Sequence, residues 1–63
     1  MKVSIIGMVG IGQVDVMVWI WEDGRVEMET SVVGVSKFTT LFREGVELDR
    51  LIEILKEARE KMG

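Results

Sequence analysis

Apolar and more polar side chains alternate with a period of two on both sides of the dipeptide Asp23-Gly24. This pattern is typical of two antiparallel strands joined by a tight turn, because successive side chains of a strand point to opposite faces. The stretch 13–33 therefore predicts a β-hairpin, which constrains the fold more than any other part of the chain. One set of alternate positions is aliphatic except for a threonine: Val14, Val16, Val18, Ile20, Val26, Met28, Thr30 and Val32.

The length of the turn decides which side chains of the two strands face one another. A two-residue turn places Ile20 opposite Glu27 and so sets acids against the aliphatic positions. A three-residue turn over 22–24, with Gly24 left-handed in a bulge, places Ile20 opposite Val26 instead. Because a slip of one residue moves every side chain to the other face, the pattern favours the three-residue turn and one aliphatic sheet face.

The opposite face of this hairpin carries both tryptophans of the chain, on the more polar side of the sheet. Tryptophan is enriched among the residues that anchor protein interfaces, and an exposed pair of tryptophans is unusual on a monomer. Two alternatives stay open: packing beneath a neighbouring element, and a stacking platform for sugars or nucleobases. The residues predicted to form a self-association or partner-binding surface are Met17, Trp19, Trp21 and Arg25.

The opening "MKVSIIGMVGIG" is similar to the start of nicotinamide-dependent dehydrogenases. Their fingerprint needs three glycines between a strand and a helix, and Val9 stands where the second glycine must let the backbone approach the pyrophosphate. The sequence that follows has the pattern of a strand, so we expect no nucleotide cofactor. We expect an edge strand instead, with glycines that allow a bend or a bulge and a turn near Gly10–Gly12. Its alternating apolar positions are Val3, Ile5, Val9 and Ile11.

The C-terminal part of the chain predicts an amphipathic helix from Leu51, with Asp49 as its N-cap and a Glu57–Lys61 pair on its polar side. We expect this helix to cover the aliphatic face of the sheet. Residues 36–44 fit either a helix or a strand, and we favour a fourth strand that ends in a turn at Glu44-Gly45. The apolar stripe of the helix consists of Leu51, Ile52, Ile54, Leu55, Ala58 and Met62.

Residue types that carry catalysis or metal binding are scarce. The chain has no cysteine and no histidine, which leaves no disulfide, no thiolate metal site and no serine–histidine triad. Glu27 and Glu29 share a face beside the tryptophans, an arrangement similar to glycosidase carboxylates, but alternating acids on an outer strand face are ordinarily solvated. We therefore expect no enzyme, no cofactor, no metal and no catalytic residue.

Together these patterns predict one α+β domain over residues 1–63. It is an antiparallel meander of three or four strands followed by one C-terminal amphipathic helix packed on one sheet face. At 63 residues and 48% hydrophobic, the chain has more apolar surface than one small core can hide, so we expect a homo-oligomer, most simply a dimer. The leading functional hypothesis is a small non-enzymatic interaction module whose specific partner stays unidentified.

The competing hypothesis is a single-stranded nucleic-acid-binding protein, because four strands and a helix resemble the topology of whirly-like modules such as the PC4-like and Pur-like domains. The net charge of −3 disfavours phosphate binding. Gln13 and Asp15 interrupt the apolar N-terminal run, so we expect no membrane span and a cytoplasmic location. Scarce Asn, Gln and Cys beside abundant charged residues is typical of thermophilic proteins.

Overall fold

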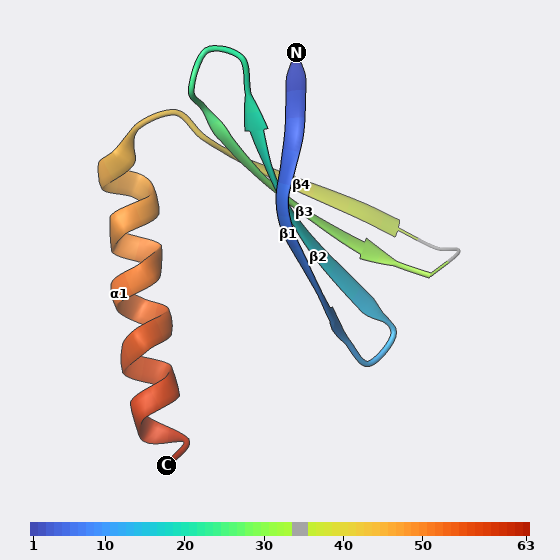
Figure 1. The fold of residues 1–63 in the computed structure, drawn as a ribbon. Helices are drawn as coiled ribbons and strands as arrows, with labels where there is room; N and C mark the ends of the chain where they lie inside the picture. The colour runs from blue at the N-terminus through green and yellow to red at the C-terminus, as the bar shows by residue number, and fades with distance from the viewer. Residues whose placement is uncertain (34–35) are drawn as a thin grey trace.

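The computed structural model describes residues 1–33 and 36–63 and shows four strands followed by one helix (Figure 1). The strands form one antiparallel sheet in which each strand pairs with its sequence neighbour. This meander, with the C-terminal helix packed against its last strand, confirms the predicted α+β fold. The elements are β1 (Lys2–Ile11), β2 (Val14–Trp21), β3 (Val26–Val32), β4 (Ser36–Phe42) and α1 (Gly45–Lys61).

The β2–β3 hairpin closes through the three-residue turn that the alternation predicts. Trp21 N–H donates to the Arg25 carbonyl at 2.8 Å, and Gly24 N–H donates to the Trp21 carbonyl at 3.0 Å. Gly24 has a φ of +90°, in the region that favours glycine because it has no Cβ. Ile20 faces Val26, so the predicted register is confirmed and the aliphatic positions of both strands share one face.

Strand β1 lies at one edge of the sheet, as predicted, and ends in a turn at Gly12, whose φ is +62°. Its alternation is more irregular than predicted, because the pairing with β2 shifts twice, once before Ser4 and once before Gly7. Each shift inserts one extra residue and reverses the relation between sequence position and sheet face. Ile5 therefore lies opposite Trp19, whereas Val9 lies on the other face, and the predicted single apolar stripe of β1 is wrong.

Residues 36–42 form a strand, as favoured, and β4 is the second edge of the sheet. The helix begins at Gly45, earlier than predicted, and Asp49 lies within it rather than at its N-cap. The Glu47 carboxylate accepts hydrogen bonds from the backbone N–H groups of Arg43 and Glu44, at 2.8 and 3.0 Å. These bonds satisfy donors that a helix start leaves free, so the helix forms directly after β4.

The helix meets the sheet at one end only. Among the described residues, α1 contacts β4 and no other strand, and Figure 1 shows the helix running away from the sheet towards the C-terminus. The radius of gyration is 12.9 Å, whereas a compact domain of this length has about 10.6 Å. We expected the helix to cover the aliphatic face. It covers only the β4 end of that face.

Candidate interaction surfaces

We call the side of the sheet that carries the two tryptophans the tryptophan face. It is formed by alternate positions of all four strands, and the pairing registers place Lys2 beside Trp21, Trp19 beside Glu27 and Ser31 beside Lys37. Two cations from the two edge strands thus flank the acids of the central strand β3. The members of the tryptophan face are Lys2, Ile5, Met8, Asp15, Met17, Trp19, Trp21, Glu27, Glu29, Ser31, Lys37, Thr39 and Leu41.

Glu27 and Glu29 are buried, with only 4% and 5% of their surface exposed, and they are the only buried residues among those described. This corrects the expectation that both acids are solvated. The Lys2 Nζ atom lies 2.7 Å from Glu27 Oε2 and 3.4 Å from Glu29 Oε1. Lys37 Nζ lies 3.2 Å from Glu29 Oε1. Burial of a charge is tolerated where opposite charges pair with it, and here two ammonium groups pair with two carboxylates.

The ion pairs shift the pKa values of Lys2 and Glu29 in opposite directions. The hydrogen bond to Glu27 is the main cause that raises the pKa of Lys2 above its ordinary 10.5. Burial raises the pKa of Glu29, but the ammonium groups of Lys37 and Lys2 lower it by more, so it lies below its ordinary 4.5. Both shifts favour the charged forms of Lys2 and Glu29, so the ion pair between them is stabilised.

Each tryptophan ring is covered by a cation. Lys2 Nζ lies 5.0 Å from the Trp19 ring centre, and the Arg25 guanidinium lies 4.8 Å from the Trp21 ring centre. Both distances fall within the range of cation–π attraction. Trp21 Nε1 donates to Glu27 Oε1 at 3.3 Å, whereas the buried Trp19 Nε1 donates to no atom of the described residues. The covered rings leave less surface for stacking sugars or nucleobases than bare rings would.

The structure brings the predicted surface together around one β2 segment. Met17, Trp19 and Trp21 lie side by side on the tryptophan face, and Arg25 covers Trp21 at the turn. All four are half-buried within the single chain, and their role in self-association stays a prediction. Sequence reasoning missed Lys2, the one cation in an apolar strand, because the β1 irregularities hid which face it occupies.

Sequence reasoning also missed Lys37, which lies on β4 and pairs with Glu29. The signal that could have found it is the alternation of β4 once that strand is paired with β3, because Lys37 then faces Ser31 on the tryptophan face. The predicted surface therefore lacked the second cation that pairs with the acids of β3.

The opposite side of the sheet, which we call the aliphatic face, is largely open. Its members from β2 and β3 are half-buried, as is Phe42 of β4, whereas Val9, Ile11 and Phe38 from the edge strands are exposed. Among the described residues no hydrophobic side chain is buried. The described members of the aliphatic face are Ser4, Gly7, Val9, Ile11, Val14, Val16, Val18, Ile20, Val26, Met28, Thr30, Val32, Phe38, Thr40 and Phe42.

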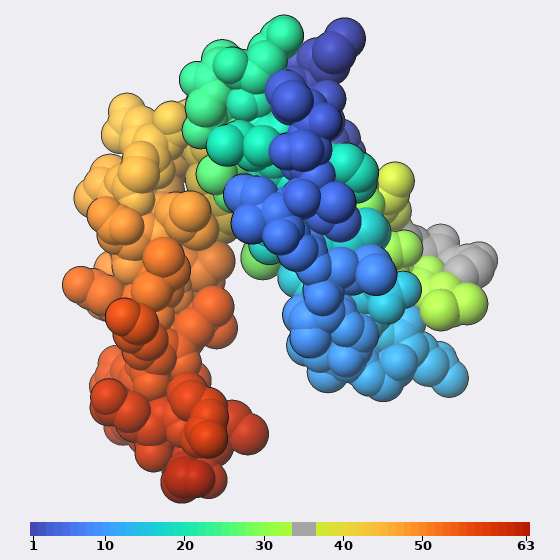
Figure 2. All heavy atoms as spheres, in the orientation of Figure 1, coloured from blue at the N-terminus to red at the C-terminus, as the bar shows by residue number. Residues whose placement is uncertain are grey.

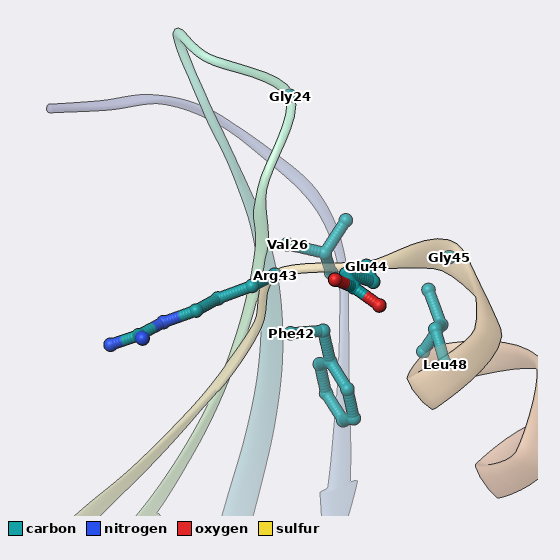
Figure 3. Close-up of a pocket in the computed structure, with 7 residues that line it drawn as sticks. All are labelled: Gly24, Val26, Phe42, Arg43, Glu44, Gly45 and Leu48. Atoms are coloured by element: carbon teal, nitrogen blue, oxygen red, sulfur yellow. The ribbon is translucent and has the colours of Figure 1, made fainter.

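The helix is attached at one corner of the aliphatic face. A small pocket there is lined by Val26 and Phe42 from the sheet and by Leu48 from the first turns of α1, with Gly24 and residues 43–45 completing its wall. Figure 3 shows Phe42 and Leu48 on the same side of the link, whereas the Arg43 side chain points away from the pocket. This contact holds the start of α1 against the sheet.

Beyond this corner the helix separates from the sheet. Leu48 and Leu51 are half-buried, but Ile52 is 42% exposed, Leu55 57% and Met62 82%. Figure 2 shows open space between the C-terminal part of α1 and the strands. The apolar stripe of the helix and the aliphatic face therefore border an open, wedge-shaped groove, which we call the helix–sheet groove.

Within the described ranges, no helix has the length and apolarity needed to cross a membrane. The same residues contain no cluster of three side chains suited to hold a metal ion. No protein-family model, no curated protein and no solved structure matches this chain.

Proposed function

We propose that the chain is a small non-enzymatic interaction module that acts as a homodimer in the cytoplasm and binds a macromolecular partner in that form. The observation that carries this proposal is the absence of any buried hydrophobic side chain among the described residues. Burial of apolar surface is the dominant favourable term in folding and in most protein association. A chain in which none of the described large apolar side chains is fully buried gains this term by association.

The size of the exposed surface supports the same proposal. The chain exposes 5050 Å², whereas a compact monomer of 7.1 kDa exposes about 4,100 Å². The excess is about 1,000 Å² per chain, close to the roughly 800 Å² that each partner contributes to a stable protein interface. Two copies that bury this excess reach about 2,000 Å² in total, within the range of permanent homodimers.

The geometry supports self-association over nucleic-acid binding. The cations of the tryptophan face, Lys2 and Lys37, are paired with Glu27 and Glu29. Arg25 at the adjacent turn is paired with Asp23, whose Oδ2 lies 2.6 Å from Arg25 Nε. A phosphate would have to displace these carboxylates, whereas single-strand binders offer a positive groove to the backbone. The described members of the aliphatic face include no charged residue.

A catalytic role also lacks support from the paired acids. Glu27 and Glu29 are neutralised by lysines, whereas the two carboxyl groups of a glycosidase flank the bond that is cleaved. The pocket lies at the helix attachment and none of its lining residues belongs to this acid cluster.

Sedimentation velocity of the wild-type chain over a hundredfold range of concentration tests the proposal. We expect one species with the mass of two chains, dissociating only at the lowest concentrations. A fluorescent single-stranded oligonucleotide in the same experiment separates the competing class. A monomer that binds the oligonucleotide, with affinity that falls steeply as salt rises, would overturn the proposal in favour of a whirly-like nucleic-acid binder.

A further inference from the structure

The helix–sheet groove has two apolar walls that the chain does not bring together itself. Leu48 lines the pocket at the sheet, and residues three, four and seven positions later lie on the same side of an α-helix. Leu51, Ile52 and Leu55 therefore continue the face of α1 that begins in the pocket, and their exposure rises with distance from β4. The groove widens towards the C-terminus of the helix (Figure 2).

The link between β4 and α1 fixes the direction of the helix and so keeps the groove open. Only Arg43 and Glu44 separate the two elements, and the backbone N–H groups of both donate to the Glu47 carboxylate. Leu48, one turn later, lines the pocket together with Phe42 of β4, the strand that α1 contacts. A helix held at both its cap and its first turn does not swing onto the sheet without breaking these contacts.

The occupant of the groove has to present apolar surface to both walls and polar surface to water. The helix α1 has this form: its charged residues lie opposite the apolar stripe and carry both signs, as in the pairs Arg50–Glu53 and Lys61–Glu57. In a twofold dimer an interface is made of the same patch on both subunits, so a helix that leaves its own sheet is free to enter the partner's groove.

Resting on the proposed homodimer, we infer that α1 of each chain lies in the helix–sheet groove of the other chain, against the partner's aliphatic face. The exchange buries Ile52, Leu55 and Met62 of one copy against the β2 and β3 side chains of the other. It also accounts for the excess exposed area of the single chain, because the two apolar walls that form the groove become the dimer core.

Engineered cysteines test this arrangement cleanly because the chain has none of its own. One preparation carries Leu55→Cys on the helix, and a second carries Val16→Cys at the centre of the aliphatic face with a mass tag. The two are mixed, unfolded, refolded together and oxidised. Because each chain has one cysteine, a disulfide between the two kinds of chain reports a contact across the interface. Lys56→Cys, on the polar side of the same helix, is the matched control.

We expect the mixed disulfide with Leu55→Cys and its loss with Lys56→Cys. If the protein sediments as a dimer but Leu55→Cys gives no mixed disulfide, the exchange is overturned while the proposed homodimer stands. If it sediments as a monomer, the proposed function fails as well. An intramolecular disulfide in the doubly substituted monomer would show that α1 closes on its own sheet.

A measurement on the wild-type chain tests the same contact and does not depend on whether the variants fold. In a dimer mixed from isotopically labelled and unlabelled wild-type chains, filtered nuclear Overhauser effects report only contacts between subunits. We expect effects between the methyl groups of Leu55 and Val16. Their absence in a dimeric sample would overturn the exchange.

Discussion

The Lys2 ammonium reaches across β2 to the Glu27 carboxylate, with Nζ 2.7 Å from Oε2, and lies over the Trp19 ring on its way. One side chain thus ties the edge strand β1 to β3 through the strand between them. The pair is asymmetric, because Glu27 is buried whereas the Lys2 side chain keeps 35% of its surface in water.

We expect Lys2→Met to lower the free energy of unfolding, because it leaves the buried Glu27 carboxylate without its counter-charge. Removing one partner of a buried pair costs more than the pair itself contributes. Lys56→Met, which removes an exposed lysine from α1, is the matched control and should leave the urea midpoint nearly unchanged. Equal effects of the two substitutions would show that the Lys2–Glu27 pair adds nothing to stability.

The pKa shifts of the same cluster predict how stability depends on pH. The pKa of Glu29 is lowered in the folded chain, so its contribution is present above pH 4.5 and is lost as pH falls through the folded value. The pKa of Lys2 is raised, so its contribution is present below pH 10.5 and is lost as pH rises through the folded value. The thermal midpoint, measured from pH 2 to 12, should be highest and nearly constant between these two limits.

The acid limb of this profile has its own control. Lys37→Met removes one of the two cations that lower the pKa of Glu29, so we expect that pKa to rise and the acid loss of stability to begin at higher pH. A carbon-detected NMR titration of the Glu29 carboxyl measures the pKa directly. An unchanged titration in Lys37→Met would contradict the role given to this ion pair.

The sequence was sufficient where neighbouring residues along the chain decide the structure. The period-two pattern around Gly24 predicted the turn length, the register and the aliphatic face, because a slip would invert every side chain. It was insufficient where distant segments meet. The burial of Glu27 and Glu29 depends on Lys2 and Lys37 from the two edge strands. No local sequence pattern predicts that these four residues come together.

The start of α1 was missed for a different reason. Asp49 is a favourable N-cap residue by type, but the backbone donors at positions 43 and 44 are satisfied by Glu47, so the helix extends further towards β4. The open groove beyond the helix start was also unexpected. An amphipathic pattern predicts that one face of a helix is apolar, but it does not predict which surface packs against that face.

Gly24 and Gly7 provide a matched pair for the conformational prediction. A Cβ atom added at either position meets nothing within 4 Å, but only Gly24 has a positive φ. We expect Gly24→Ala to destabilise by about 1–2 kcal/mol, because an L side chain is strained in the left-handed region. Gly7→Ala should be neutral or slightly stabilising. Urea unfolding measures the free energy of unfolding of both variants. Equal changes in the two variants would contradict the role of backbone strain at the turn.

Two surfaces compete as the site of self-association, and one substitution on each separates them. Leu55→Asp places a charge in the helix–sheet groove, and loss of a buried leucine costs about 1.5–3 kcal/mol per subunit, so the dimer Kd should rise about a hundredfold or more. The double variant Trp19→Ala with Trp21→Ala disrupts the tryptophan face instead. Sedimentation that shows dissociation only in the tryptophan variant would place the interface at Met17, Trp19, Trp21 and Arg25, as the sequence suggested.

The thermal midpoint of the wild-type chain should rise with protein concentration, because the apolar surface that stabilises the fold is completed only in the dimer. When folding and association are coupled, a tenfold increase in concentration stabilises the dimer by about 1.4 kcal/mol. For a dimer of two 63-residue chains, the entropy of unfolding converts this into a rise in Tm of about 5 °C.

Calorimetry at three concentrations spanning a hundredfold range should therefore give midpoints that differ by about 10 °C between the lowest and the highest concentration. The Leu55→Asp variant supplies the control, since a chain that no longer associates should have a lower midpoint that is independent of concentration. A concentration-independent midpoint in the wild type would mean that the fold is stable as a single chain. The apolar walls of the groove would then be an exposed surface that a partner other than a second copy has to cover.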